Sequence, residues 1–451
     1  MLSTRVMELE ARLRGDSSNS SRPPSTDGPV KPVRQRGLKP RSTQVPGGQQ
    51  GHPGAHLARV TTPDEVVEHR PDRCGACGVQ FPATAPVADY QVRQVFELPV
   101  IKALVVEHRL VSLRCGCGAI CQGAWPYGVD APAVYGPRAQ AAVCYLYQHQ
   151  FLSRGRSAQT AQDLFGLPVS TGSVVNFQAR AAHDLAGFMA QAGDLVKQAP
   201  VVGADETGIR VAGKNHWLHV ARTDKVTVLG AHRRRGRVAM TDLGILPGFD
   251  GVLVSDAFSS YDKMTGDGGR HQLCAAHLRR ELQAVTDFHQ LHPEYLGEAG
   301  WDWAVQADDA LMVIIKACAQ SPDGCCPPDV LAAQRCLLNS AAVIAASSDH
   351  GPPGQIGAKH LALARRIHRR LDDYLRFAVT PGVSPDNNGS ERDFRMAKLR
   401  MKVSGGLRCD DGAQWFARIR SYLSTCVKNQ INGFDALLRV YTGNPWLPQT
   451  A

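Results

Sequence analysis

The sequence predicts an α/β protein, and the contexts of three carboxylates are the main indication. Asp205 and Asp256 each end a short apolar run, 200–204 and 251–254, as expected where buried central strands deliver side chains to the rim of a sheet. Glu391 instead opens a basic segment with helical spacing. Hard divalent cations prefer oxygen ligands. Two such ions held about 3.5–4 Å apart can stabilise the attacking and leaving oxygens of a phosphoryl displacement.

Length, charge and cysteine content limit the class of protein. A chain of 451 residues predicts two or more domains, and a net charge of +10 with a pI near 9.0 favours a polyanionic partner. The 13 cysteines are odd in number and mostly isolated, which favours a reducing compartment over a disulfide framework. No signal-peptide pattern opens the chain, and its longest apolar segments, around 311–319 and 341–346, are shorter than a membrane span. We therefore expect a cytoplasmic protein with no membrane partner.

The N-terminal part divides into a helix and a linker. Leu2, Val6, Leu9 and Leu13 recur at helical spacing, so residues 1–15 predict a short amphipathic or coiled helix. Residues 16–59 are rich in Ser, Pro, Gly and Gln and predict a flexible basic linker. Its basic residues are Lys31, Arg34, Arg36, Lys39 and Arg41. A solvated linker is the simplest interpretation, and contact with DNA phosphates is the alternative.

Residues 60–125 predict a small zinc-ribbon-like β domain. Strand-forming runs at 90–98 and 103–113 lie between two cysteine pairs, Cys74 with Cys77 and Cys115 with Cys117. Four thiolates close a tetrahedral structural Zn²⁺ site and stabilise a domain whose core is too small to hold alone. Because the second pair has C-x-C spacing, either Cys115 or Cys121 is the fourth ligand beside Cys117. Four unligated thiols are the alternative to zinc.

Residues 130–195 predict a helical, helix-turn-helix-like region. Helices are expected at 157–165 and 171–182, with a turn at 166–170 whose end caps the second helix. The second helix of such a motif enters the major groove of DNA, which would bring Ser173 and Asn176 to the DNA. A helix pair that serves only as scaffold is the alternative.

Residues 200–430 change to a strand pattern and then return to helix. Strands are predicted at 201–211, 216–222 and 226–231, joined by short turns, and a fourth at 252–256 follows a crossover. The helical stretch from about 285 to 375 indicates an insertion between the second and third acids. Helices are predicted again at 390–402 and 412–428, and residues 431–451 are expected to form a tail. Trp301 and Trp303 are expected in the core, with stacking on an unpaired base as the alternative.

Four motifs resemble those of the insertion-sequence-66 family of transposases: D-E-T at 205–207, S-D-A-F-S-S-Y at 255–261, C-A-A-H-L-R-R-E at 274–281 and N-N-G-S-E-R-D-F-R at 387–395. The N-terminal segments N-S-S-R-P-P-S and G-G-Q-Q-G-H-P-G and the cysteine pairs are also similar to that family. The resemblance implies a ribonuclease-H-like mixed-sheet core with a helical insertion. It also implies a D-D-E triad of Asp205, Asp256 and Glu391 that cuts and joins DNA with two Mg²⁺ or Mn²⁺ ions. In such a five-stranded sheet the first and fourth strands are adjacent, so the two aspartates can converge while a packed helix brings Glu391.

Each acid also has a purely structural interpretation. Asp256 could cap a helix that begins at Ala257, and Glu391 could lie in a first helical turn to suit the helix dipole. Glu206 follows Asp205 but points to the opposite face of a strand, so it is not expected to be a ligand. His277 is expected to support the site or to face DNA.

Basic residues around the second and third acids predict the contacts with DNA. Arg395 and Lys398 lie on the same helical face as Glu391 and are expected to hold phosphates. The residues predicted to contact DNA are Ser173, Asn176, Arg279, Arg280, Arg392, Arg395, Lys398, Arg400 and Lys402, with Arg408 on the border. A solvated basic helix is the alternative.

The resemblance implies an enzyme that binds the ends of its mobile element, cleaves a DNA strand and joins the freed 3′-hydroxyl to target double-stranded DNA. A homo-oligomer in the DNA complex and accessory proteins of the same element are the further partners expected. Two other functions remain open. One is a ribonuclease-H-like nuclease or resolvase that does not join strands, and the other is an inactive zinc-dependent DNA-binding protein.

Overall fold

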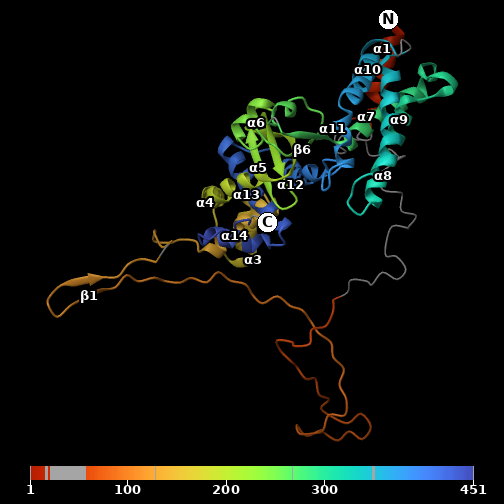
Figure 1. Cartoon of the computed structure of the whole chain (residues 1–451). Coiled ribbons are helices and arrows are strands. Elements are labelled where there is room, and N and C mark those ends of the chain that lie inside the picture. The colour runs from red at the N-terminus through yellow and green to blue at the C-terminus, as the bar shows by residue number, and fades with distance from the viewer. Residues whose placement is uncertain are drawn as a thin grey trace. The chain divides into compact units, whose positions relative to one another are not determined.

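The computed structural model describes residues 2–15, 19–20, 57–126, 128–266, 268–347 and 351–449 (Figure 1). Most of the predicted linker at 16–59, including its five basic residues, lies outside the described residues. The chain divides into two compact units: Gln35–Ile101 forms one, and Met1–Arg34 together with Lys102–Ala451 forms the other.

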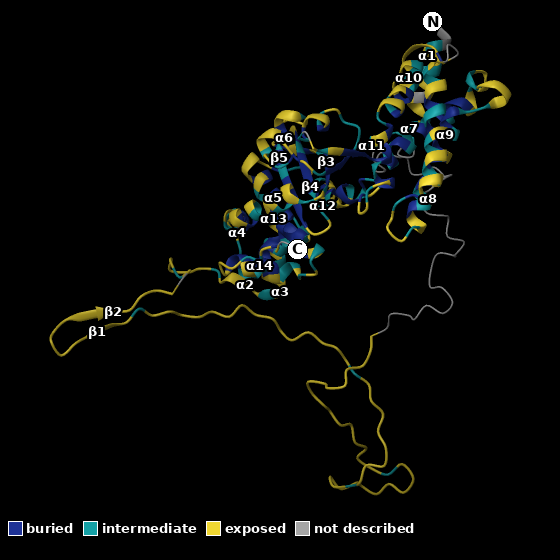
Figure 2. Cartoon of the chain, viewed as in Figure 1, coloured by how far each residue is buried: buried dark blue, intermediate teal, exposed yellow. Residues whose placement is uncertain are grey.

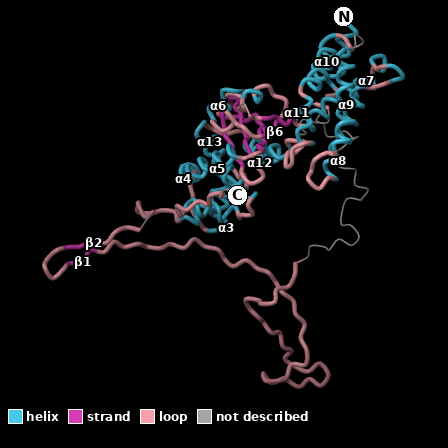
Figure 3. Tube along the Cα trace, in the orientation of Figure 1, coloured by secondary structure: helices cyan, strands magenta, loops and turns pink. Residues whose placement is uncertain are grey.

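A mixed five-stranded sheet with the order β5-β4-β3-β6-β7 forms the centre of the larger unit (Figure 3). Its strands are β3 (Val201–Val211), β4 (Lys214–Arg222), β5 (Thr227–His232), β6 (Val252–Ser255) and β7 (Arg270–Leu273). β4 is antiparallel to β3 and β5, whereas β6 is parallel to β3 and β7. The four predicted strands are confirmed, and the first and fourth are adjacent as expected.

Helices cover the sheet on both faces and along one edge. Helix α12 (Asn388–Ser404) packs against β3 and β4, where its Phe394 joins a core cluster with Ile209 and Leu218. Helix α13 (Asp410–Lys428) lies along the edge strand β5, and the hydroxyl oxygens of Ser421 and Thr425 accept hydrogen bonds from backbone N–H groups of β5. This contact satisfies donors that an edge strand would otherwise leave unpaired.

The region predicted at 130–195 and the end of the chain share one core with the other face of the sheet. The helices involved are α2 (Pro137–Cys144), a π-helical turn (Tyr145–His149), α3 (Arg154–Phe165), α4 (Thr171–Asp184), α5 (Ala186–Gln198), α6 (Arg237–Leu243) and α14 (Gly433–Tyr441). Residues 431–451 were expected to be a tail, but α14 buries Leu437 and Val440 completely against α2 and α4. Its short amphipathic pattern gives a weak signal in the sequence, and tertiary packing is what stabilises a helix of this length.

The predicted insertion is helical, and its core also includes residues of β6 and β7. It contains α7 (Ala275–Leu291), α8 (Trp303–Gln320), α9 (Pro328–Ser347), α10 (Gly354–Arg369) and α11 (Leu371–Leu375). Short 3₁₀ turns lie at Tyr261–Lys263, Pro293–Tyr295, Glu298–Gly300 and Arg376–Ala378. Trp303 is buried in this core, as predicted. By length and composition alone α9 could cross a membrane, but it packs against α8 and α10, and α10 also contacts the N-terminal helix α1 (Leu2–Leu13).

The predicted zinc-ribbon-like region has fewer strands than expected. Its only strands among the described residues are β1 (Ser112–Arg114) and β2 (Ile120–Gln122), which pair in an antiparallel hairpin. The strand predicted at 90–98 is absent, and only 112–113 of the run 103–113 is in a strand. These runs are extended and largely exposed (Figure 2). Residues with high strand propensity form a β-strand only where their backbone pairs with a neighbouring strand through hydrogen bonds.

Candidate active site

The register of the parallel strands places the two predicted aspartates level with each other. Gly203 of β3 lies opposite Val254 of β6, and Asp205 and Asp256 each follow two residues later. Adjacent strands are about 4.8 Å apart, and side chains two residues apart share a face. Asp205 lies within β3, on the face of Gly203 that the start of α12 covers, and Asp256 directly follows the last residue of β6.

The start of α12 is fastened to β3 beside Asp205. The Asn387 side-chain amide donates to the carbonyl oxygen of Ala204 at 2.7 Å, and its own carbonyl oxygen accepts from the Ser390 hydroxyl at 2.7 Å. Asn387 is buried, and its backbone N–H donates to the Cys274 sulfur at 3.2 Å. These bonds hold the first turn of α12, which carries Glu391, against the strands that carry the aspartates. The sequence interpretation did not single out Asn387, although the residue lies in the quoted N-N-G-S-E-R-D-F-R motif.

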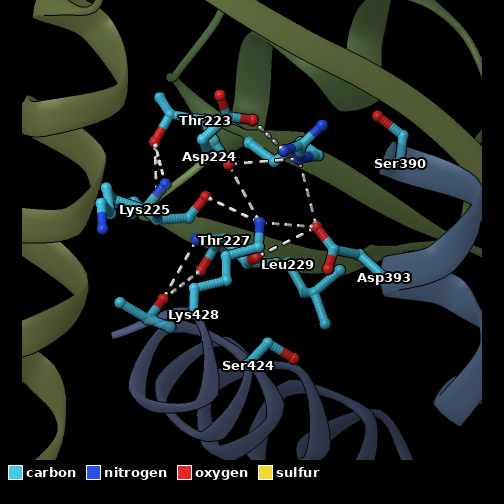
Figure 4. A network of polar contacts seen from close by, with 12 residues as sticks. Thr223, Asp224, Lys225, Thr227, Leu229, Ser390, Asp393, Ser424 and Lys428 are labelled. Atoms are coloured by element: carbon cyan, nitrogen blue, oxygen red, sulfur yellow. Dashed lines mark hydrogen bonds and ion pairs between the residues drawn. The ribbon is translucent and has the colours of Figure 1, made fainter. Parts of the chain in front are cut away.

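A second fastening lies two residues beyond Glu391 (Figure 4). The Asp393 carboxylate accepts from the Lys428 ammonium and from the Thr227 hydroxyl, both at 3.0 Å, and Arg222 lies 3.6 Å away. Burial lowers the pKa of Lys428 to about 8, with the charges of Asp393 and Arg222 acting in opposite directions. The network ties α12 to the ends of β4 and β5 and to α13. The sequence interpretation had missed it because its partners are far apart in the chain.

The three predicted catalytic carboxylates lie within electrostatic reach of one another. Burial raises the pKa of Asp205, and together with the negative charges of Glu206, Asp256 and Glu391 it brings that pKa to about 8. The backbone N–H of Glu206 donates to Asp205 at 2.8 Å and partly offsets this rise. An acid that is buried among other acids has its charged form destabilised, and a bound cation would remove that cost.

Of the two structural interpretations, the helix cap at Asp256 is wrong and the position of Glu391 in a first helical turn is confirmed. The Asp256 carboxylate accepts a hydrogen bond from the backbone N–H of Phe258 at 3.0 Å, in a turn rather than at the start of an α-helix. Glu391 lies in the first turn of α12.

Carboxylate oxygens are the ligands that Mg²⁺ and Mn²⁺ prefer, so the donor set fits the implied ions. The arrangement is nevertheless not a finished coordination shell. Within the described ranges, no three His, Cys, Asp or Glu side chains are grouped closely enough to hold one metal ion. Glu391 instead forms an ion pair with Arg280 at 3.5 Å.

His277 lies beside the same acids. Burial lowers its pKa, as does the charge of Arg280, whereas the charges of Asp256 and Glu391 raise it. Its buried Nδ1 has no hydrogen-bond partner among the described residues. Whether His277 supports the site or faces DNA stays a prediction.

Glu206 belongs to a separate cluster on the opposite face of β3. Its carboxylate accepts from Arg235 Nε at 2.8 Å and from the Tyr261 hydroxyl, and its side chain is only 1% exposed. Burial raises the pKa of Glu206 despite these bonds. Tyr261 lies in the turn that follows Asp256, so the cluster links that turn to β3.

The predicted DNA contacts fall into two groups. Exposed or half-buried positions are found for Ser173, Asn176, Arg280, Arg392, Arg395, Lys398, Lys402 and Arg408. Arg279 and Arg400 occupy positions that disfavour the predicted role. Arg279 forms a two-point ion pair with Asp308 of α8, at 2.6 and 2.9 Å, with 11% of its side chain exposed. Arg400 is buried over the Tyr147 ring, at 4.2 Å from its centroid.

Helices α3 and α4 and the turn between them are found where the sequence predicts them. Gly166 ends α3 in the left-handed conformation (φ 58°), and the Ser170 hydroxyl oxygen accepts from the Ser173 N–H at 3.0 Å to cap α4. Asn176 is exposed on α4, whereas Phe177 is buried against the core. The DNA-binding role of this pair stays a prediction.

Each predicted pair of zinc-binding cysteines forms a local turn with sulfur-directed hydrogen bonds. The backbone N–H of Cys77 lowers the pKa of Cys74, and the backbone N–H of Cys117 lowers the pKa of Cys115. Cys121 lies on β2, opposite Leu113 of β1. The two pairs belong to different compact units, Gln35–Ile101 and the larger one.

Comparison with known families supports the resemblance seen in the motifs. Residues 132–415 match the model of the Transposase IS66 family, and residues 1–58 match a family of unknown function (DUF6444). No curated protein matches the chain. The family match spans the sheet, the helical insertion and the three acids. The chain therefore belongs to the IS66 family of transposases.

Proposed function

We propose that this transposase is a metal-dependent DNA strand transferase with a ribonuclease-H-like core. The observation that supports this most is the environment of Asp205: burial, with smaller contributions from the charges of Glu206, Asp256 and Glu391, raises its pKa to about 8. The strand order, with β3 beside both the antiparallel β4 and the parallel β6, supports the assignment of the core. Acids delivered by two strands and a helix suit ions that act on phosphate oxygens.

Each part of the site has a role in this proposal. Bound Mg²⁺ or Mn²⁺, two ions in the complete site, would supply an activated water and neutralise charge that develops on the phosphate. Asp205 would hold these ions from within β3 and Asp256 from the residue after β6, and Asn387 would position Glu391 for the same task. Arg280 is placed to exchange its ion pair with Glu391 for a phosphate group.

The DNA would be held by exposed cations and by α4. Arg392, Arg395, Lys398 and Lys402 project from α12, with Arg408 just beyond its end, and guanidinium and ammonium groups bind phosphates without sequence preference. Ser173 and Asn176 of α4 would contact the element end. Cys74, Cys77 and Cys117, with Cys115 or Cys121, would hold a structural Zn²⁺. We further propose that the protein acts in the cytoplasm on double-stranded DNA, as a homo-oligomer, with accessory proteins of its element.

A strand-transfer assay tests this function against its alternatives. Purified protein is given a labelled duplex that ends in a pre-cut element end with a free 3′-hydroxyl, a supercoiled target plasmid and Mg²⁺. We expect label to become covalently joined to the plasmid, and Asp205→Asn to abolish joining while duplex binding is retained. Cleavage of intact ends without joining would favour a nuclease or resolvase. Binding without either reaction would favour an inactive DNA-binding protein.

A further inference from the structure

We propose that the segment 233–237, which connects β5 to α6, is a second contact for the DNA backbone beside the active site. It contains four arginines, Arg233, Arg234, Arg235 and Arg237, all of them exposed. The inference rests on the proposed function, because it assigns to that site a surface that receives DNA phosphates.

Arg235 anchors the segment to β3, on the face opposite to Asp205, and to the turn that follows Asp256. It donates to Glu206, the residue after Asp205, at 2.8 Å. Its guanidinium lies 4.4 Å from the ring centroid of Phe258 and 4.9 Å from that of Trp217. A side chain at Gly236 would place its Cβ 3.1 Å from the Ser260 hydroxyl oxygen. The segment therefore lies directly against the turn that follows Asp256.

Further bonds fix the backbone around Arg234. Its carbonyl oxygen accepts from His219 Nε2 at 3.2 Å, and its N–H donates to His232 Nδ1 at 3.0 Å. Arg233 forms an ion pair with Asp410 at the start of α13. A fixed backbone presents its exposed side chains with little loss of conformational entropy when they bind.

Two cations remain without a partner in this anchored segment. Within the described part of the chain, the guanidinium groups of Arg234 and Arg237 have no ion pair or side-chain hydrogen bond, whereas Arg233 and Arg235 are each paired with a carboxylate. Arginine presents a planar set of donors that matches phosphate oxygens. The two free arginines belong to a segment that lies against the turn after Asp256, and they thus fit the sugar-phosphate backbone that flanks the reacting phosphate.

Salt-dependent binding tests the contact. The affinity of Arg234→Ala/Arg237→Ala for a fluorescent duplex of arbitrary sequence is measured over a range of NaCl concentrations. Each lost phosphate contact lowers the slope of log K against log salt by about 0.9, so we expect the slope to fall by about 1.8. Arg234→Lys/Arg237→Lys should keep most of the slope, since it keeps the charge. Unchanged thermal unfolding of both variants shows that the anchored segment is intact.

A matched pair of exposed arginines provides the control. Arg365 and Arg369 lie on α10, which packs against α9 and α11 in the insertion. Arg365→Ala/Arg369→Ala removes the same charge and should leave the slope unchanged. The inference is overturned if the segment variant binds with the wild-type slope, or if both pairs lose binding equally.

Photo-crosslinking locates the contact. A p-benzoylphenylalanine at position 237 should capture an element-end duplex within a few nucleotides of the cleaved bond, and the same group at position 369 should not. Capture at distant nucleotides alone contradicts the inference. The proposed function is tested separately: if it is wrong, Asp205→Asn still cleaves DNA. If Asp205→Asn is inactive but Arg234→Ala/Arg237→Ala binds DNA like the wild type, only the present inference is wrong.

Discussion

The side-chain amide of Asn387 donates a 2.7 Å hydrogen bond to the carbonyl oxygen of Ala204, the residue that precedes Asp205. This bond joins the helix that carries Glu391 to the strand that carries the first aspartate. Both groups are buried, so the bond is not exchanged for one with water. The distance between the first and third acids thus depends on a residue that carries no charge.

Asn387→Ala should therefore lower the cleavage rate strongly while lowering the free energy of unfolding only modestly. Leaving the Ala204 carbonyl oxygen without its donor costs about 1–3 kcal/mol of unfolding free energy. The cleavage rate should fall severalfold more than DNA binding, because α12 is released from β3. Denaturant unfolding, duplex binding and cleavage are measured on the same preparation.

Asn388→Ala is the matched control for this prediction. Among the residues that the structure describes, the Asn388 side chain bonds to Asp386 alone, within the same turn, so its loss should leave the cleavage rate close to that of the wild type. Equal losses of cleavage in the two variants would contradict the role assigned to Asn387.

The sequence was sufficient for the parts of the site that depend on local pattern. Apolar runs that end in an acid predicted β3 and β6, and a return of helical spacing predicted α12. The roles of Asn387 and Asp393 were not predictable in this way, because their partners are β3, β5 and α13. Arg279 and Arg400 also show that local pattern does not reveal tertiary contacts. Their spacing beside basic neighbours predicted DNA contacts, and only tertiary packing reveals that they are enclosed by Asp308 and Tyr147.

The Asp393–Lys428 pair should show strong coupling in a double-mutant cycle. Removing one partner of a buried pair leaves an uncompensated charge and typically costs about 3–5 kcal/mol. We expect Asp393→Asn to destabilise the wild type by about this amount, or by less if Arg222 is stabilised by water instead. The same substitution should have a much smaller effect in a Lys428→Met background. Urea unfolding of the four proteins gives the coupling free energy. Strictly additive effects would show that the network does not hold α12.

His219 should make the protein sensitive to acid. Burial lowers the pKa of His219 to about 4 from an ordinary value of 6.5. The unfolded chain therefore binds a proton more readily than the folded one between these values. The stability contributed by neutral His219 is complete above about pH 6.5, is lost as the pH falls towards 4, and amounts to about 3 kcal/mol. His219→Gln, which keeps a donor for the Arg234 carbonyl, should lose less stability than the wild type between pH 7 and 4.5.

His183→Gln serves as the control for that comparison, since the His183 side chain is 89% exposed. It should lose as much stability on acidification as the wild type. If His219→Gln behaves in the same way, neutral His219 makes no measurable contribution.

Zinc content tests the cysteine assignment independently of any reaction on DNA. Purified protein should release one Zn²⁺ per chain when its thiols are titrated with a mercurial reagent in the presence of a chromogenic chelator. Cys77→Ser should lose this zinc, whereas Cys336→Ser, an exposed cysteine of α9, should keep it. Comparing Cys115→Ser with Cys121→Ser identifies the fourth ligand. Retention of zinc in Cys77→Ser would contradict the assignment.

Residues 90–98 and most of 103–113 are extended but unpaired, and the sequence did not show whether these runs would pair as strands. The β-forming residues are present, but a strand also needs a backbone partner, and propensity alone does not supply one. The sheet of the larger unit was easier to predict, because short apolar runs separated by turn residues marked its strands.

Manganese binding tests the central claim most directly. Mn²⁺ is titrated into the metal-free protein and followed by electron paramagnetic resonance, for the wild type and for Asp205→Asn, Asp256→Asn and Glu391→Gln, with folding checked by circular dichroism. We predict that each substitution weakens Mn²⁺ binding at least about tenfold, as expected when one ligand of a shared site is lost. Wild-type Mn²⁺ affinity in any one of the three folded variants would contradict a common site formed by these carboxylates.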